Sequence, residues 1–172
     1  MNDADAIDFA LLLLRSGVGV VMLAHGINHI RPNIDGTARW FASMGMKPPK
    51  LHAWLASVTE IAGGLALVLG LLTPFAAAGV VGVMFVAWAI NHRGNGFFIF
   101  RPGEGWEYAM TLGIAGSAIG ALGPGGWSLD DALDLTDDLH GTTGLAIAVI
   151  GGIGGGIALL AGFWRPPATD PE

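Results

Sequence analysis

The chain has 172 residues, of which 52% are hydrophobic and only 13% are charged, and its formal net charge is −6. Soluble domains carry about 25% charged residues, so this chain is poor in charge. Disordered chains have low hydrophobicity and high charge, so this composition excludes a disordered chain. The absence of Cys excludes a disulfide framework and a Cys-ligated metal site. Only 8 Lys and Arg stand against 14 Asp and Glu, which argues against nucleic-acid binding and leaves lipid as the main solvent.

Five stretches are long and apolar enough, or nearly so, to cross a hydrocarbon core of roughly 30 Å as helices. They cover residues 7–30, 51–72, 74–90, 108–122 and 141–164. The fourth is the shortest, but we count it as a span because the loops on either side of it differ in charge. We therefore expect an all-α membrane protein with a four-helix transmembrane bundle in residues 1–135. A fifth, Gly-rich transmembrane helix and a short tail follow in residues 136–172.

The positions of Lys and Arg predict the orientation of these spans, because cytoplasmic loops carry an excess of positive charge. Arg15 lies inside the first span, and the other seven basic residues all lie in the 31–50 loop, the 91–107 loop and the tail. The acidic leader, the turn at 73–74 and the 127–140 loop contain none. We expect a multi-pass protein of the bacterial inner (plasma) membrane, with the N-terminus outside and the C-terminus in the cytoplasm.

Two ionisable side chains lie well inside the predicted spans, Arg15 in the first and Glu60 in the second. Such groups cost a few kcal/mol at membrane depth, so each is a functional hypothesis. Because the two spans run antiparallel, we predict that Arg15 and Glu60 form a buried ion pair. Two interpretations remain open: the pair fixes the packing of the helices, or it is a catalytic pair in which Glu60 accepts a proton.

A second polar group is expected at the cytoplasmic ends of the first four spans. Its members are His25, His29, His52, Asn91, His92 and Glu107. These side chains could bind a quinone headgroup through hydrogen bonds, which is the interpretation we prefer, with simple interfacial packing close behind. Haem or metal binding ranks lower, because no HExxH or Glu-x-x-His pattern is present, and we assign no residue to a metal.

The fifth predicted span repeats small residues four apart: Gly144, Ala148, Gly152 and Gly156. This spacing lets two helices approach closely, and the partner is either another span of the same chain or a second protein. We expect the Gly144/Gly152/Gly156 face to dock other protein subunits or a second copy of this chain.

Several short motifs resemble the DoxX family of small membrane proteins. The first is Arg15 followed by Ser-Gly-Val-Gly, with His25 and Gly26 after it; the second is Glu60 followed by Ile-Ala-Gly-Gly-Leu. The resemblance covers about residues 11–131 and matches the family pattern at Arg15, His25, Glu60, His92, Glu107 and Asp130. The chain departs from the pattern at Gly126, where the family commonly has Arg, and in its fifth span.

The resemblance implies a four-helix membrane bundle associated with redox machinery. Family members are described as subunits of a thiosulfate:quinone oxidoreductase and as partners of a sulfurtransferase and a superoxide dismutase. We therefore expect a membrane subunit of an oxidoreductase complex that interacts with quinone and has no redox centre of its own. The alternative is a non-catalytic accessory or anchoring subunit of a larger membrane assembly. A transporter is disfavoured, since no repeat pair or ring of pore charges is visible.

Overall fold

The computed structural model describes residues 2–136 and 139–167, and within this part of the chain all regular elements are helical. The elements are α1 (Asp3–Ile30), α2 (Ile34–Ser43), α3 (Pro49–Leu69), α4 (Thr73–Ala87), η1 (Trp88–His92), α5 (Glu107–Leu122), α6 (Leu129–Ala132), α7 (Gly141–Ala146), η2 (Ile147–Gly151) and α8 (Gly152–Phe163). The π-helical turn η1 continues α4, and η2 joins α7 to α8, so each combination forms one rod. The predicted all-α membrane fold is confirmed.

Four of these rods are long and apolar enough to cross a membrane: Asp3–Ile30, Pro49–Leu69, Thr73–His92 and Gly141–Phe163. They coincide, within a few residues, with four of the five predicted spans. The fifth predicted span, residues 108–122, coincides with α5, which has 16 residues and is therefore about 24 Å long. Since α5 packs against α1, α4 and α7, it belongs to the same bundle, and its full crossing of the membrane stays a prediction.

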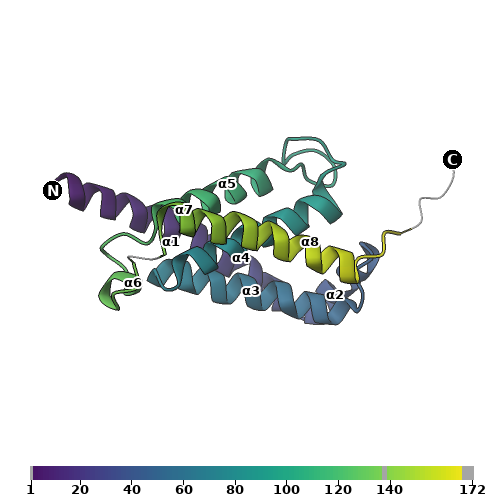
Figure 1. Cartoon of the computed structure of the whole chain (residues 1–172). Helices are drawn as coiled ribbons and strands as arrows, with labels where there is room; N and C mark the ends of the chain where they lie inside the picture. The colour runs from purple at the N-terminus through teal and green to yellow at the C-terminus, as the bar shows by residue number, and fades with distance from the viewer. Residues whose placement is uncertain (1, 137–138, 168–172) are drawn as a thin grey trace.

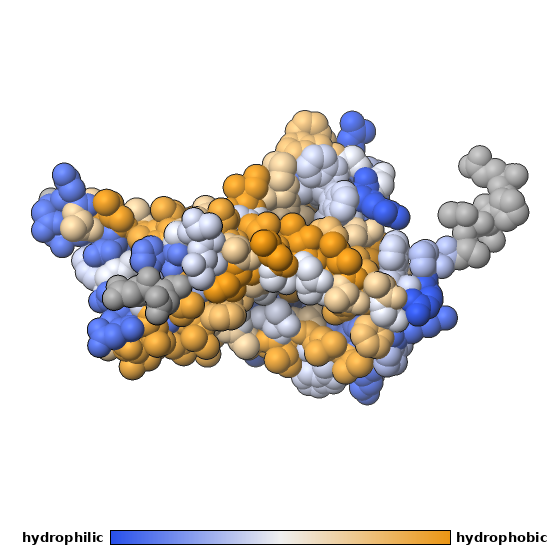
Figure 2. All heavy atoms as spheres, viewed as in Figure 1, coloured by the Kyte–Doolittle hydropathy of each residue, from blue (hydrophilic) through white to orange (hydrophobic). Residues whose placement is uncertain are grey.

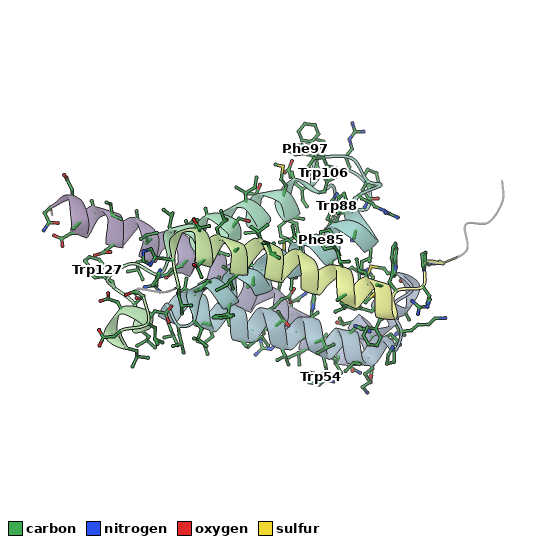
Figure 3. The ribbon with its side chains drawn as sticks, viewed as in Figure 1. Trp54, Phe85, Trp88, Phe97, Trp106 and Trp127 are labelled. Atoms are coloured by element: carbon green, nitrogen blue, oxygen red, sulfur yellow. The ribbon has the colours of Figure 1, made fainter. Side chains whose placement is uncertain are left out.

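The bundle has two distinct ends (Figure 1). The N-terminus and α6 lie at one end, which we call the α6 end, and α2 lies at the other, the α2 end. Hydrophobic surface covers the middle of the molecule in the view of Figure 2, and the most hydrophilic residues gather towards the two ends. In Figure 3, Trp127 lies at the α6 end, whereas Trp88, Trp106 and Phe97 lie towards the α2 end. Aromatic residues near both ends of an apolar band are typical of membrane interfaces.

Helices α1 and α3 pack closely against each other, and glycines make this approach possible. A Cβ atom on Gly19 would lie 2.6 Å from the carbonyl oxygen of Gly64, and a Cβ on Gly64 would lie 2.6 Å from that of Gly19. Farther along, a Cβ on Gly26 would lie 2.8 Å from the carbonyl oxygen of Ser57. These contacts fix the register of the two helices, which decides the partners of the ionisable residues they carry.

The short helix α2 was not expected, although the sequence contains its pattern. Asn33 caps it by accepting a hydrogen bond from the Asp35 amide at 2.8 Å, and Ala38 and Phe41 are buried. Lys50 bonds the Asp35 carboxylate at 2.8 Å, tying α2 to α3, and this contact lowers the pKa of Asp35. Ser128 caps the short helix α6, because its hydroxyl accepts a hydrogen bond from the Asp131 amide at 3.1 Å.

The glycine face of the fifth rod packs inside the chain. A Cβ on Gly144 would clash with the carbonyl oxygen of Gly120 on α5, and one on Gly152 would lie 2.7 Å from the carbonyl oxygen of Ala78 on α4. A Cβ on Gly156 would lie 2.7 Å from the Phe85 ring. The expected use of the Gly144/Gly152/Gly156 face for docking other subunits is therefore corrected, since α4 and α5 already cover it.

The α1–α3 contact predicts different effects for two neighbouring glycines. We expect Gly64→Ala to lower stability by about 2 kcal/mol, because the new methyl group overpacks the contact with Gly19. The matched variant Gly63→Ala should leave stability unchanged, since a Cβ there meets only the Ala76 carbonyl oxygen at 3.8 Å. Thermal unfolding of the two variants in the same detergent measures the difference. Equal melting temperatures would contradict the close contact.

Candidate functional site

Arg15 is fully buried, with 1% of its surface exposed, and its partners are backbone carbonyls. The guanidinium donates to the carbonyl oxygens of Leu67 at 3.0 Å, Val68 at 2.6 Å, Pro124 at 3.1 Å and Trp127. The first two are at the C-terminal end of α3, where helix carbonyls lack partners within the helix. Arg15 therefore joins α1, the end of α3 and the 124–127 segment at the α6 end.

The predicted Arg15–Glu60 ion pair is wrong, and the register of α1 and α3 explains why. Arg15 lies level with Leu67 and Val68, whereas Glu60 precedes Leu67 by seven residues, roughly 10 Å along the helix. The nearby carboxylate is instead Asp130, which is 1% exposed and accepts the Leu72 amide at 2.6 Å and the Thr73 amide at 2.9 Å.

Gly70 allows this arrangement at the α6 end. It ends α3 in the left-handed conformation with φ +65°, which glycine adopts without steric cost. A Cβ there would lie 2.5 Å from the Ser128 Cβ and 2.9 Å from the Arg15 Cζ. The α6 end is thus a tightly packed, hydrogen-bonded closure of the bundle, with a structural role for Arg15.

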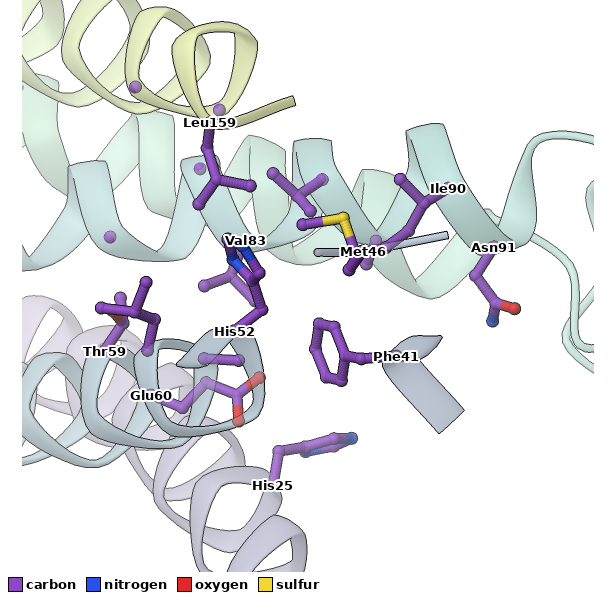
Figure 4. A pocket seen from close by; sticks show the side chains of 18 of the residues that line it. His25, Phe41, Met46, His52, Thr59, Glu60, Val83, Ile90, Asn91 and Leu159 are labelled. Carbon is purple, nitrogen blue, oxygen red and sulfur yellow. The ribbon is translucent and has the colours of Figure 1, made fainter. Parts of the chain in front are cut away.

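A cavity of about 490 Å³ lies between α1, α2, α3, α4 and α8 (Figure 4). We call it the histidine cavity. Polar side chains from three spans and from α5 line it: His25, His29, His52, Glu60, Asn91, His92 and Tyr108. Five of the six side chains predicted to bind a cofactor are therefore brought together, namely His25, His29, His52, Asn91 and His92.

Glu107 is the predicted residue that the structure does not bring to this cavity. It begins α5 and lines a separate groove with Val21 and Phe97, whereas the next residue, Tyr108, reaches the histidine cavity. Successive helical residues differ by about 100° in direction, so two neighbours at a helix start face different ways. The acidic residues that line the cavity are instead Glu60 and Glu104.

Three buried polar atoms of the cavity have no hydrogen-bond partner. In the described part of the chain, four buried side-chain nitrogen or oxygen atoms are unpartnered, and three of them line this cavity: His29 Nδ1, His52 Nδ1 and Glu60 Oε2. His52 and Glu60 are only 2% and 4% exposed. His29 Nδ1 and Glu60 Oε2 are 3.5 Å apart, which is longer than a normal N–H···O bond. Unsatisfied buried polar groups are costly, so these three atoms are available to accept or donate hydrogen bonds inside the cavity.

Backbone carbonyls orient three of the four histidines. Ring nitrogens bond carbonyl oxygens in three pairs: His25 Nδ1 with Val21 at 2.9 Å, His52 Nε2 with Lys47 at 3.3 Å and His92 Nδ1 with Glu104 at 2.9 Å. Since a carbonyl oxygen only accepts, each of these nitrogens carries a proton, and the other nitrogen of a neutral ring is an acceptor. For His52 this acceptor is the unpartnered Nδ1.

Aromatic rings hold two of the histidines from the side. The His25 ring stacks on Tyr108 with centroids 5.7 Å apart and planes at 12°, and His29 meets the Trp40 ring at 6.3 Å. Trp40 belongs to α2, so this helix covers the cavity. Among residues 2–136 and 139–167, no group of three or more His, Asp or Glu side chains is placed to hold a metal ion. The arrangement suits hydrogen bonding to one small polar group in apolar surroundings.

Apolar rods around an internal cavity with a cluster of polar side chains define a small multi-pass membrane protein. The DoxX family model matches residues 10–93, so this segment is similar to the DoxX family. The matched segment runs from α1 to η1 and carries all four histidines of the cavity together with Glu60. No curated protein and no solved structure matches the chain significantly.

The carbonyl contacts of Arg15 predict a structural phenotype. We expect Arg15→Met to destabilise the protein by roughly 3 kcal/mol, because hydrogen bonds from a charged donor are lost and buried carbonyls stay unpaired. Thermal unfolding measures this loss, and Arg101→Met, at an exposed loop position, is the control. A variant as stable as the wild type would contradict the role assigned to Arg15.

Proposed function

We propose that the histidine cavity binds a quinone headgroup and that the chain is the quinone-binding membrane subunit of an oxidoreductase complex. The observation that carries this proposal is the set of three unpartnered buried atoms, on His29, His52 and Glu60, in one largely apolar cavity. Quinones dissolve in the hydrocarbon core and carry two polar oxygens on an apolar body, which matches a few convergent polar groups in an apolar pocket.

Both forms of the ligand find partners among these groups. A quinone carbonyl accepts a hydrogen bond from a protonated imidazole such as His29, and a quinol hydroxyl donates to His52 Nδ1 or to the Glu60 carboxylate. Reduction of a quinone to the quinol takes up two electrons and two protons. His29 and Glu60, 3.5 Å apart, are placed to transfer protons, and the electrons come from a redox centre on a partner subunit.

The family supports this direction, since DoxX proteins are membrane proteins associated with oxidoreductase functions. The alternative, a non-catalytic accessory or anchoring subunit, makes no use of the cavity. Ligand binding by the isolated chain therefore separates the two roles.

The proposed function also requires an orientation of the chain in the membrane. We propose that the α2 end faces the cytoplasm and that the N-terminus and α6 lie outside, following the distribution of Lys and Arg in the loops. The natural chain has no Cys, so single cysteines can be labelled cleanly. With a membrane-impermeant maleimide on intact cells, we expect Asp131→Cys to react and Lys47→Cys to react only after lysis. The reverse pattern would contradict this orientation.

Two carboxylates near the α2 end provide a matched test of binding. We expect Glu60→Gln to weaken the binding of a short-chain benzoquinol about tenfold, because the amide NH₂ replaces a carboxyl oxygen that can accept the quinol hydroxyl. Glu107→Gln should change the affinity less than twofold, since Glu107 lies outside the cavity. Equilibrium binding to the protein in lipid nanodiscs measures both.

The outcomes of this experiment are distinct. Weaker binding by Glu60→Gln alone supports the quinone site. Equal effects of the two variants, or no binding by the wild type, would contradict it and leave the accessory role.

A further inference from the structure

The apolar half of the histidine cavity shows what kind of quinone the site takes. Resting on the proposed function, we propose that a slot between α3 and α8, with α4 as its floor, holds the long isoprenoid chain of the ligand. The ligand then enters sideways from the bilayer, and its headgroup lies among the histidines and Glu60.

The cavity is strongly divided between polar and apolar walls. Its polar lining belongs mainly to α1, α3 and η1, whereas α4 contributes Gly79, Gly82, Val83 and Val86, and the fifth rod contributes Gly151, Gly155 and Leu159. Figure 4 shows Leu159 on one side of the cavity and Glu60 and His25 on the opposite side. An occupant that satisfies both walls has a polar head and an apolar extension.

The glycines of the fifth rod serve two different purposes. Gly152 and Gly156 pack against α4, where a Cβ would come within 2.7 Å of the Ala78 carbonyl oxygen or of the Phe85 ring. All four glycines line the cavity, but Gly151 and Gly155 have open surroundings: a Cβ on Gly155 would meet no heavy atom within 4 Å, and one on Gly151 would meet the Ala78 Cβ at 3.9 Å. Close packing of helices therefore accounts for the first pair, and the second pair leaves space empty.

This space opens at the side of the bundle. Leu55 and Thr59 on α3, with Gly151 and Gly155 opposite, line the cavity and are also exposed on the surface. In Figure 1, α3 and α8 run along the same side of the molecule, and α4 packs against both. Since α3 and the fifth rod are both long and apolar enough to cross the membrane, the opening lies within the hydrocarbon region.

The α2 end of the slot is closed, so the opening lies farther along the helices. The His52 ring lies 5.0 Å from the Phe163 ring, and the Trp164 indole donates to the Met44 carbonyl at 2.8 Å. These contacts attach the end of α8 to α3 and to the segment after α2. From Gly151 to Leu159 the slot follows α8 for roughly 12 Å, enough for an extended apolar chain beside the headgroup.

Adjacent glycines supply a matched pair of variants to test the slot. Gly155→Leu places a side chain in the slot, and Gly154→Leu places one on the exposed surface, because Gly154 does not line the cavity and has equally open surroundings. Binding of a long-chain isoprenoid quinone and of the same headgroup without a chain is measured for both variants in lipid nanodiscs. We expect Gly155→Leu to weaken long-chain binding at least tenfold and to change headgroup binding less than twofold, with Gly154→Leu unchanged in both.

Each result separates this proposal from the proposed function. Unchanged long-chain binding by Gly155→Leu, or an equal loss of both ligands, would overturn the slot while the quinone site stands. Failure of both ligands to bind the wild type would overturn the quinone site itself.

A measurement on the unmodified protein guards against variants that do not fold. A long-chain quinone with a photoreactive group on its chain is bound to the wild type, irradiated and mapped by mass spectrometry. We expect labelling of peptides that contain Thr59 or Gly155, and labelling confined to α1 and α5 would overturn the proposal.

Discussion

An ionisable side chain inside an apolar bundle must find polar partners, and this requirement is met differently at the two ends of the molecule. At the α6 end, Arg15 is satisfied by four carbonyl oxygens. In the histidine cavity, Glu60 has one imidazole at 3.5 Å, and three buried atoms stay unpartnered. The cost of such groups in a low-dielectric interior is the physical basis of the proposal that a polar ligand occupies the cavity.

The division between a closed end and an open cavity follows from where the helices can approach. Gly19 and Gly64 bring α1 and α3 into backbone contact, and Gly152 brings the fifth rod against α4. The cavity lies between α3 and the fifth rod, and Trp40 and Phe41 of α2 cover it. Close glycine packing thus determines where the rods meet and where the cavity lies between them. The same residue type both closes the bundle and leaves the slot open.

The sequence predicted the spans well because long apolar stretches in lipid have helices as their main solution. It also predicted that His25, His29, His52 and His92 gather at one end, since alternating helix directions determine which residues share a depth. It failed on the Arg15–Glu60 pair, because side-chain partners depend on helix register, which Gly19 and Gly64 set through tertiary contact. The helix α2 was missed although Asn33 and the spacing of Ile34, Ala38 and Phe41 indicate it. Glu107 was misplaced because the direction of a helix start is fixed only by the loop before it.

The central claim, that the cavity holds an isoprenoid quinone, is tested most directly on protein extracted gently from its native membrane. Native mass spectrometry of the intact chain, followed by identification of the released lipid, measures what occupies it. The account predicts one quinone for each chain, released when long-chain quinone analogues are added in excess. A chain that retains no quinone from quinone-rich membranes, and takes up none when it is supplied, would contradict the account.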